Sequence, residues 1–509
     1  MRAPKQARAH LIPMRIICLL IVLLPSLWGW EATPTTAQSG TVTWSGPVNL
    51  SRTPSASAHP AIVTDAYGYV HVFWSEEMGG EPMRPNDHIR NTGNSILYTR
   101  WDGTTWSPPI DVLLVPGETI ADYPAVDIDA ESRLHLVWTS MTSLYYSNAP
   151  SWQADSAQDW SEPLLLADNS AATPWGADIV ADASGGLHVV YAVRGDQAGV
   201  YYTRSVDGGE NWQSPIKLSD SLEPLEEHFS TVQIIRDDAR NLHAVWGTNQ
   251  LEGAGQAVYY ARSIDGGDTW SVPAQLGYRG PDDFVVGLPY LTAVGASELH
   301  LIYVAGRYVG SRGRYHRIST DGGETWSAPY HIITDLVGIN GYVEPVVDSA
   351  GQMHLIINMR SRDDQVVGIY YARWLGTGWS QVEPVDVSQP SAHYTAVAVR
   401  LGNELHVVYT QLAGGEIWHL RGRVTPAKQT SARPWPSPEA PTPTPLTKVT
   451  ATPPQTPTPT AQRITQPPEG TTPPSSLSVM SNPLLPGVGA ALLLVVAVIV
   501  WIQIRSRRG

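Results

Sequence analysis

The segment LHLVW at Leu134–Trp138 is one of seven similar pentapeptides that decide the fold of this chain. Successive copies begin 52 to 64 residues apart. A repeat of this period indicates one supersecondary unit that is copied in a ring or a stack. The copies are VHVFW from Val70, LHLVW from Leu134, LHVVY from Leu187, LHAVW from Leu242, LHLIY from Leu299, MHLII from Met353 and LHVVY from Leu405.

Each repeat reads as four short β-strands. The first alternates apolar and polar residues, as in PAVDID from Pro124, and the second is the LHLVW-like segment. The third resembles YYTRS from Tyr201, and a glycine turn leads to a fourth that opens W-S-x-P. Four strands at hairpin spacing form one propeller blade. We therefore predict an all-β fold, a seven-bladed β-propeller with four-stranded antiparallel blades, with a six-bladed ring plus one atypical unit as the alternative.

The last repeat is incomplete, and its missing strand lies at the other end of the chain. After the LHVVY strand from Leu405 and a third strand from Ile417, a Pro/Thr-rich segment begins at once. The W-S-x-P pattern occurs instead before the first repeat, at Trp44–Val48. We expect this N-terminal strand to dock beside the strand near Trp418 and to close the last blade. Closure removes exposed sheet edges, which otherwise invite aggregation.

The composition excludes several classes of protein. Only 16 % of the 509 residues are charged, the net charge is −14, and four lysines occur. A basic surface is absent, so we expect no nucleic-acid partner. The one cysteine, Cys18, lies in an apolar leader, so we expect a folded domain without disulfides, because a core of this size is held by burial alone. We expect a monomer.

Both ends of the chain carry signals of membranes. Basic residues up to Arg15 precede the short apolar run from Ile16 to Trp28, which is the pattern of a secretory signal. The apolar stretch from Leu484 to Ile504 contains no charge and is long enough to cross a bilayer as a helix. Three arginines follow it and predict a cytoplasmic C-terminus. We thus expect a single-pass protein of the cell membrane whose folded body is extracellular.

A segment rich in Pro and Thr, as in PTPTP from Pro441, connects the repeats to the apolar stretch. It has no apolar periodicity, so no core can form, and repeated proline holds the backbone near polyproline II. We interpret it as a disordered stalk. The predicted organisation is a signal peptide at 1–37, the propeller at 38–424, the stalk at 425–483, a transmembrane helix at 484–504 and a cytoplasmic tail at 505–509.

Three turns between third and fourth strands share the pattern S-x-D-G-G-x-x-W. They are SVDGGENW from Ser205, SIDGGDTW from Ser263 and STDGGETW from Ser319. The aspartate can accept backbone N–H bonds within the turn, the glycines permit positive φ, and the tryptophan can pack into the blade. We predict a structural role for these residues, which are Asp207, Asp265, Asp321, Trp212, Trp270 and Trp326.

This pattern resembles the Asp-box, or BNR repeat, of sialidases (neuraminidases) and related β-propellers. The resemblance covers roughly residues 41 to 424 and implies the propeller fold. In sialidases it further implies three arginines that grip the sugar carboxylate, a Tyr nucleophile activated by a Glu, and an acid/base Asp. This chain departs from the pattern, because the R-I-P motif of the first arginine is absent and Ala58 stands at its best counterpart. Catalytic sialidases are also six-bladed, and seven repeats are present here.

Arginines of the fifth and sixth repeats are candidate ligand-binding residues. The loops between second and third strands should share one rim with the connections between blades, so these loops would be neighbours. A cluster of guanidinium groups there could bind a carboxylate or a sulfate. The alternative is that they are solvated and pair with nearby aspartates. The candidates are Arg307, Arg312, Arg314, Arg360 and Arg362.

Aromatic or histidine residues occur where each first strand begins. Innermost strands begin at the mouth of a propeller, where flat side chains could stack on sugar faces. Packing between blades is the alternative interpretation. The ligand-binding candidates of this kind are Tyr123, Trp175, Tyr342 and Tyr394, and the same place holds His59, His228, Phe229, Tyr290 and His393.

The seven histidines of the LHLVW-like strands suggest a metal site, but their placement argues against one. One residue per blade lies far from the next, whereas a metal needs its ligands within a few ångströms. We predict that these histidines are buried, hydrogen-bonded and structural, and we expect no metal and no cofactor. They are His71, His135, His188, His243, His300, His354 and His406.

Three functional hypotheses follow. The preferred one is a surface-displayed propeller that binds a glycan, such as a sialoglycoconjugate, or another ligand at its mouth. The second is an exo-α-sialidase or a related glycoside hydrolase with relocated residues. The third is a scaffold for protein partners. The absence of R-I-P favours binding over catalysis.

Overall fold

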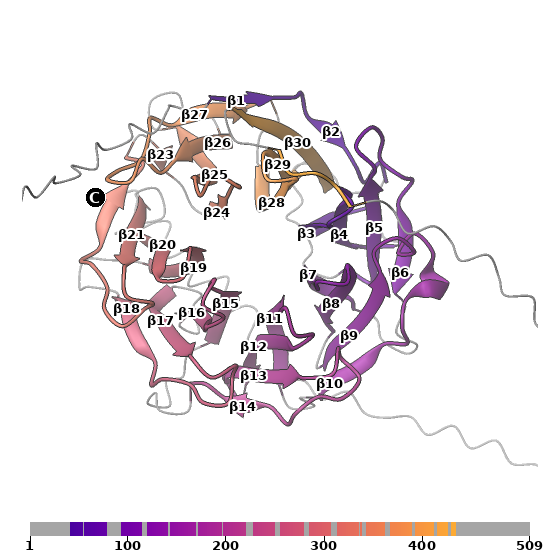
Figure 1. The fold of residues 1–509 in the computed structure, drawn as a ribbon, viewed down its shortest axis with the longest axis horizontal. Coiled ribbons are helices and arrows are strands. Elements are labelled where there is room, and N and C mark those ends of the chain that lie inside the picture. Colours follow the sequence, from indigo (N-terminus) through magenta and orange to yellow (C-terminus); the bar gives the residue numbers. More distant parts are fainter. Residues whose placement is uncertain are drawn as a thin grey trace, which may run out of the picture. The chain divides into compact units, whose positions relative to one another are not determined.

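The computed structural model describes a single ring of β-sheets formed by residues 41–433 (Figure 1). The predicted signal peptide, most of the stalk and the predicted transmembrane helix lie outside the described residues. No helix in the described part of the chain is long and apolar enough to cross a membrane. The residues left out within 41–433 are 54, 79–92, 114–119, 141–142, 169–171, 196, 220–227, 250–254, 279–284, 307–312, 335, 338–342, 362–366, 389–391, 412–414 and 426–428.

Seven antiparallel sheets surround one axis, which confirms the prediction of a seven-bladed propeller. Within blades 1 to 5, the strands follow one another from the axis outward in the order of the sequence. Blade 1 contains β3 (Ser57–Thr64), β4 (Val70–Glu76), β5 (Ser95–Trp101) and β6 (Ile110–Leu113). Blade 2 contains β7 (Asp122–Ile128), β8 (Arg133–Thr139), β9 (Ser143–Pro150) and β10 (Leu164–Asp168), with the short 3-10 helix η1 (Ala157–Asp159) before β10.

Blades 3 to 5 repeat this four-stranded arrangement. Blade 3 contains β11 (Ala172–Ala181), β12 (Leu187–Gly195), β13 (Gly199–Ser205) and β14 (Ile216–Lys217). Blade 4 contains β15 (His228–Arg236), β16 (Leu242–Asn249), β17 (Gly255–Ser263) and β18 (Ala274–Tyr278). Blade 5 contains β19 (Val285–Val294), β20 (Glu298–Gly306), β21 (Gly313–Ser319) and β22 (Tyr330–Ile332).

Blades 6 and 7 vary the plan. In blade 6, both β23 (Leu336–Val337) and β24 (Val343–Val347) pair with β25 (Met353–Ser361), which is followed by β26 (Val367–Arg373) and β27 (Glu383–Asp386). Blade 7 contains β28 (Ala392–Arg400), β29 (Glu404–Gln411) and β30 (Glu416–Thr425), and its outer edge is completed by β1 (Thr41–Trp44) and β2 (Val48–Asn49).

The N-terminal strands close the ring as the sequence predicts. Trp44 of β1 lies opposite Gly422 of β30, and Asn49 of β2 lies opposite Trp418. A side chain at position 422 would not fit, because its Cβ would lie 2.7 Å from the Trp44 indole. The two ends of the folded chain therefore meet in blade 7, and we call the junction of this blade with blade 6, where Trp44 packs against Tyr371, the seam.

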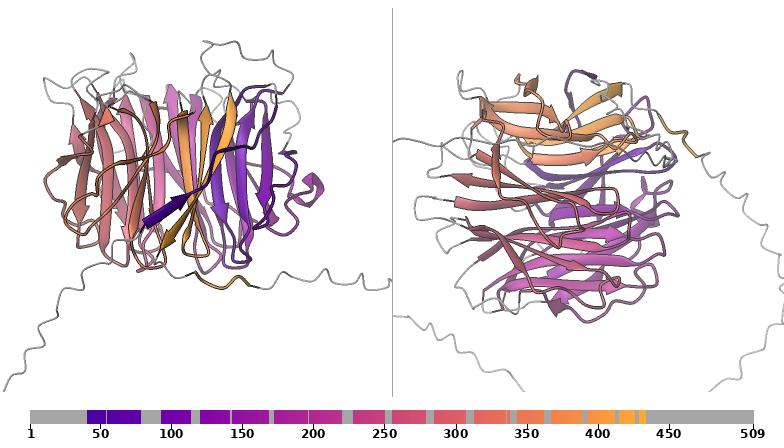
Figure 2. Two further views of the ribbon diagram at one scale, coloured as in Figure 1. Left: turned by 90° about the horizontal axis from the view of Figure 1, so that it is seen from above. Right: turned by 60° about the vertical axis from the view of Figure 1, so that its left-hand side comes forward.

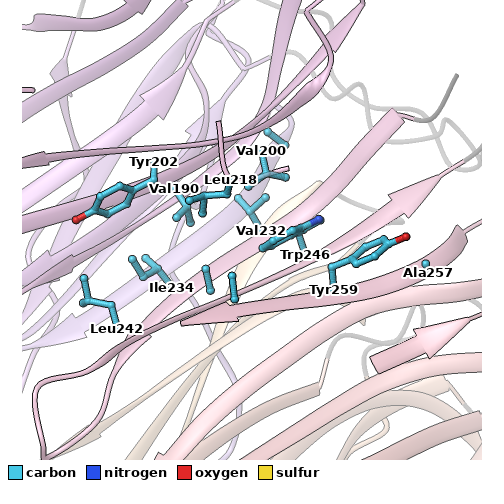
Figure 3. Packing of buried hydrophobic residues seen from close by; sticks show 13 residues of the cluster. Val190, Val200, Tyr202, Leu218, Val232, Ile234, Leu242, Trp246, Ala257 and Tyr259 are labelled. Carbon is cyan, nitrogen blue, oxygen red and sulfur yellow. The ribbon is translucent and has the colours of Figure 1, made fainter. Parts of the chain in front are cut away.

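The hydrophobic core lies between the blades. The LHLVW-like strands and the third strands place apolar side chains on both faces of each sheet, so one buried cluster forms at every junction of neighbouring blades, including the seam. Figure 3 shows the cluster between blades 3 and 4, where Val190 and Tyr202 face Ile234 and Trp246. Trp246 has no exposed surface.

The two faces of the ring carry different connections (Figure 2). We call the mouth face the one at which the innermost strands begin and the second strands end. The Asp-box face is the opposite one, with the turns from first to second and from third to fourth strands. Apolar residues of the innermost strands, such as Ile62 and Val126, pack against the clusters between blades and remain partly exposed.

Candidate functional site

Each Asp-box turn is held by its own serine and aspartate. In the first, Ser205 donates a hydrogen bond to Asp207 (2.7 Å) and accepts one from the Gly209 N–H (2.9 Å), and Asp207 accepts the Asn211 N–H (2.9 Å). Hydrogen bonds from Asn211 and Ser205 lower the pKa of Asp207 to about 2. These carboxylates stabilise backbone turns. The hydrogen bonds of the other two boxes likewise lower the pKa values of Asp265 and Asp321 to about 2.

Aromatic pairs join every blade to the preceding one. Trp212 meets Tyr146 of the preceding blade edge to face, with ring centroids 5.1 Å apart. An edge-to-face arrangement of this kind contributes about 0.5–1.5 kcal/mol beyond the buried area. The other two Asp-box tryptophans, Trp270 and Trp326, meet Tyr202 and Tyr260. The remaining four junctions use Trp44–Tyr371, Trp106–His419, Trp160–Tyr98 and Trp379–His316.

The repeated histidines are buried and hydrogen-bonded, as predicted. His71 Nδ1 lies 2.8 Å from the Tyr98 hydroxyl, and its Nε2 lies 3.3 Å from Asp65. Burial lowers the pKa of His71, and Asp65 opposes this only in part. In blades 5 and 7 a glutamate replaces the aspartate and a second histidine replaces the tyrosine. The same relation is found at His135, His188, His243, His300, His354 and His406.

A β-bulge near the mouth end interrupts the innermost strand of six blades. Each bulge contains a residue with positive φ, a conformation that residues other than glycine rarely adopt. Such strain persists where the surrounding structure fixes it, and it often marks functional positions. The corresponding residues of blade 6 lie outside the described residues. The positive-φ residues are His59, Tyr123, Gly176, Thr231, Leu288 and Tyr394.

Three of these bulges bring their side chains together at the mouth of blades 7, 1 and 2. The His59 imidazole stacks on the Tyr123 ring at 3.9 Å between centroids, and the Tyr394 ring meets it edge-on at 4.3 Å. His59 Nδ1 lies 2.6 Å from Asp122, which also accepts the Tyr123 N–H. Both tyrosines are partly exposed, whereas His59 is only 6 % exposed. We call His59, Asp122, Tyr123 and Tyr394 the mouth cluster.

Buried polar groups surround the mouth cluster. Glu76 is fully buried, accepts hydrogen bonds from Ser57 (2.5 Å) and from the Trp74 indole (3.0 Å), and has its pKa raised by burial. Burial and the nearby His59 lower the pKa of His393 to about 4. Within the described residues, the buried atoms of this region without a hydrogen-bond partner include His59 Nε2, Asp122 Oδ2 and Glu76 Oε1. Buried groups of this kind commonly bind ordered water or a ligand.

Blade 3 adds a positive charge beside this region. Arg194 of β12 is half-buried and interacts electrostatically with Tyr123. The combination of tyrosine faces, an imidazole, a carboxylate and a guanidinium offers both stacking surfaces and hydrogen-bonding groups. Such a set suits a ligand with ring faces and many hydroxyls.

The expected arginine cluster is not assembled within the described residues. Arg307, Arg312 and Arg362 lie outside them, and Arg360 belongs to β25 without a described side chain. Arg314 is placed differently from the expected open rim, because it has no exposed surface. Residues two apart on a strand share a face, and His316 on that face contacts tryptophans of blade 6. Arg314 is therefore directed toward the junction with blade 6.

The four aromatic candidates also lie in different places. Tyr123 and Tyr394 meet in the mouth cluster through His59. Trp175 lies in the bulge of β11, although its side chain is not described, and Tyr342 lies outside the described residues. The alternative interpretation, in which these aromatic residues pack between blades, is confirmed in part. His59 of blade 1 contacts Tyr123 of blade 2 and Tyr394 of blade 7.

Carboxylates on the innermost strands were missed by sequence reasoning. Asp178 of β11 accepts the backbone N–H of Ile234 in the next blade at 2.9 Å, and burial raises its pKa to about 7. Burial, with the nearby charge of Asp178, raises the pKa of Glu344 well above its usual range. The available signal was a charged residue within the alternating pattern of a first strand. Asp127 and Gln233 make equivalent bonds to Ala181 and Leu291.

Asp122, Glu76 and Arg194 were missed as well. Asp122 directly precedes the candidate Tyr123, and Glu76 ends the first LHLVW-like strand. The sequence therefore shows that both residues lie near the ends of strands that reach the mouth. Their burial beside the mouth depends on how blades 7, 1 and 2 meet. In the described part of the chain, no group of three or more His, Cys, Asp or Glu side chains is placed to hold a metal ion.

The chain is similar to known propellers in sequence and in fold. Residues 234–425 match the BNR repeat-like domain, and no curated protein matches the chain. The BP39L lectin of Burkholderia pseudomallei superposes with a TM-score of 0.53 and 14 % identity, covering 74 % of this chain and 99 % of the lectin. An ulvan lyase bound to -[GlcA(1-4)Rha3S]- gives 0.50 and 11 %, covering 73 % and 95 %. A Hadza microbial sialidase gives 0.44 and 10 %, covering 76 % and 96 %.

These comparisons show that residues 234–425 are similar to BNR repeats and that the described chain shares the fold of known β-propellers. At such low identities, the similar structures show the fold alone. The activity must therefore be argued from the residues of this chain.

Proposed function

We propose that this protein binds glycans at the mouth of its propeller. The observation that carries this is the mouth cluster, in which bulges of three blades present two partly exposed tyrosines around a histidine–aspartate pair. Aromatic faces stack on the apolar faces of sugars, and the polar groups can hydrogen-bond hydroxyls. The similarity in fold to a lectin and a polysaccharide lyase is compatible with such a ligand.

We also propose that the propeller is displayed outside the cell on a membrane-anchored stalk. The signal-like leader and the apolar C-terminal stretch support this part of the proposal. The last described residues lie on the Asp-box face, where Thr430 and Arg433 donate backbone hydrogen bonds to Leu401 and Ala66. A stalk that starts there leaves the mouth free for a ligand.

The binding proposal is tested by screening the purified full-length chain, in detergent, on an array of sialylated, uronate-containing and neutral glycans. Tyr123→Ala and Tyr394→Ala should each weaken binding of the retained glycan about tenfold. The stacking of a nucleobase on an aromatic side chain, which is a similar contact, contributes about 1–3 kcal/mol to binding. Tyr278→Ala is the matched control, because Tyr278 is 67 % exposed on the outer strand β18. Equal loss in all three variants, or no glycan retained, would refute the proposal.

A second candidate function is chemical processing of the bound glycan. It is favoured by the His59–Asp122 pair, because a carboxylate that holds an imidazole nitrogen is the usual way to orient a general acid or base. The exo-α-sialidase form of this hypothesis needs converging arginines. Those with described ion pairs, such as Arg204 and Arg262, bind carboxylates of the next blade's Asp-box.

Turnover of a fluorogenic sialoside by the full-length chain would support the sialidase alternative. A new conjugated double bond, detected by ultraviolet absorbance during incubation with a uronate polysaccharide, would instead indicate elimination. His59→Ala should abolish either activity. Turnover that survives His59→Ala would place the chemistry elsewhere, and binding without turnover would leave the lectin-like function alone.

A further inference from the structure

Two turns of blade 4 on the Asp-box face are joined differently from their counterparts. In blade 3, the Gly208 N–H of the Asp-box donates to Gly185 in the turn between first and second strands (3.1 Å). Gly322 makes the same bond in blade 5 (2.9 Å). The corresponding residues of blade 4 are Gly266 and Arg240, and within the described residues no backbone hydrogen bond joins them. The Gly266 N–H can therefore donate to another acceptor.

Arg240 also occupies a strained position. Its φ is 70°, and the corresponding residues of blades 1, 3 and 6 are Gly68, Gly185 and Gly351. Residues other than glycine adopt this conformation at a cost. The Arg240 side chain is exposed, so packing does not explain why an arginine stands here. Such strain points to a functional role for the side chain.

A pocket lies beside these two residues, at the junction of blades 3 and 4. Its volume is about 270 Å³, and Ser184 and His188 line it from blade 3. Arg236, Arg240 and Gly266 line it from blade 4. Burial lowers the pKa of His188, and the charge of Arg236 adds to this effect. Arg236, which ends β15, therefore acts across the junction, and two guanidinium groups border one pocket.

These two arginines differ from the others nearby, because no carboxylate binds them. Arg204 and Arg262 each form an ion pair with an Asp-box carboxylate of the next blade. Arg236 and Arg240 form no hydrogen bond and no ion pair with any residue that the structure describes. Guanidinium groups in this state are strong binders of oxyanions.

The two carboxylates of the pocket are held by their own turns. Asp182 accepts the N–H groups of Ser184 (2.7 Å) and Gly186 (2.8 Å). Asp265 accepts the hydroxyl (2.6 Å) and the N–H (2.9 Å) of Thr269, and these bonds lower its pKa to about 2. Both carboxylates offset the charge of the arginines but leave the guanidinium N–H groups open. Binding in the pocket must therefore depend on directed hydrogen bonds more than on net charge.

We propose that this pocket binds a tetrahedral oxyanion, a sulfate or phosphate group, held by Arg236, Arg240 and the Gly266 N–H. Such a group has acceptor oxygens in several directions, which suits donors from a strand end and from two turns. Ile264 at the rim is 71 % exposed and offers an apolar contact to the carbon skeleton of a sulfate ester. The site lies on the Asp-box face and is independent of the ligand at the mouth.

Equilibrium dialysis of the full-length chain, in detergent, against radiolabelled sulfate at constant ionic strength tests the site. Arg236→Gln and Arg240→Gln should each weaken sulfate binding about tenfold, as expected for loss of a charge-assisted hydrogen bond. Arg262→Gln is the matched control, because it removes the same charge from the same blade but from an arginine that already binds Glu324. No sulfate retained by the native chain, or an equal loss in Arg262→Gln, would refute the proposal.

Arg240→Gly separates binding from folding. It should weaken sulfate binding as much as Arg240→Gln, yet raise the urea concentration at half-unfolding, because glycine relieves the strain of the positive φ. A lower urea midpoint would show that the arginine serves the fold and would contradict the proposal.

Competition distinguishes the source of the oxyanion. If glucose 6-sulfate displaces the labelled sulfate at a lower concentration than unlabelled inorganic sulfate does, the ligand is a sulfate ester. Ile264→Ser should then remove this advantage. Equal displacement by both would assign the site to the free ion, and displacement by sodium chloride at the same ionic strength would show that no specific site exists.

Discussion

The two faces of the ring differ in what they repeat. On the Asp-box face, the same side chains make the same contacts from blade to blade, as in the relay of Asp65, His71 and Tyr98. On the mouth face, the backbone bulge is repeated but its side chain changes, from His59 to Thr231 to Leu288. Side chains that are repeated in every blade stabilise the fold of each blade. Variable side chains on a repeated backbone create one distinct sector, which is where we place the ligand.

The largest effect should come from the Asp-box glycines. Gly266 and Gly267 both have positive φ, but only Gly267 lacks space, since a Cβ there would lie 1.8 Å from the Tyr202 hydroxyl. Gly266→Ala should lower the free energy of unfolding by about 1 kcal/mol through backbone strain alone. Gly267→Ala should lower it by about 3 kcal/mol or more, because overpacking adds to the strain. Urea denaturation measures both, and equal losses would contradict the packing argument.

A somewhat smaller loss is expected at the seam. Trp44 packs edge-on against Tyr371 at 5.7 Å and is half-buried. Trp44→Ala should cost about 2 kcal/mol, below the 3–5 kcal/mol of a fully buried tryptophan. Trp270→Ala, at a junction within the continuous chain, is the comparison. If the seam variant unfolds in a separate early transition, whereas Trp270→Ala unfolds in one step, the seam is the weaker junction.

Acid should destabilise the Asp-box face. Burial alone would raise the pKa of Asp348, but hydrogen bonds from His354 and the turn hold that pKa below its usual value of 3.8. The stabilisation is thus present above pH 4 and is lost as the pH falls through the folded-state pKa. The lowered pKa of His71 acts in the same direction below pH 6.5, because the unfolded state takes up the proton first.

Urea denaturation at pH 7, 5 and 3 should therefore show falling stability. Asp348→Asn should lower the free energy of unfolding by about 1.5–3 kcal/mol at pH 7, the value of a hydrogen bond to a charged group, and its stability should depend less on pH. An undiminished dependence on pH in this variant would remove Asp348 from the explanation.

The innermost strands should make a smaller contribution to the pH dependence of stability, and this contribution should have the opposite sign. The pKa of Asp178 is raised by burial to about 7, so the folded state holds the proton more tightly than the unfolded state. Its stabilising contribution is present at low pH and is lost as the pH rises through about 7. Stability should fall slightly from pH 6 to 8 in the native protein and less in Asp178→Asn. A steeper fall in the variant would contradict this assignment.

The sequence predicted most of the architecture because the same strand pattern occurs seven times. An uncertain strand assignment in one repeat is resolved by the other copies. Seven copies of one strand pattern fixed the number of blades, and a displaced W-S-x-P segment fixed the closure at Trp44. The mouth was less predictable, because the positive φ of Tyr123 and the burial of Glu76 depend on contacts between blades. Arg314 was placed at an open rim, whereas strand alternation directs it inward.

The pairing of β1 with β30 has a consequence for synthesis. The ribosome makes the N-terminal strand first, yet its partner ends at Thr425, so blade 7 cannot be completed until nearly the whole propeller has been made. Domains fold as their residues emerge, and contacts between distant residues form slowly. The first strand to be made is thus the last to be paired, and until then the nascent chain keeps an unprotected β-edge that a chaperone would have to cover.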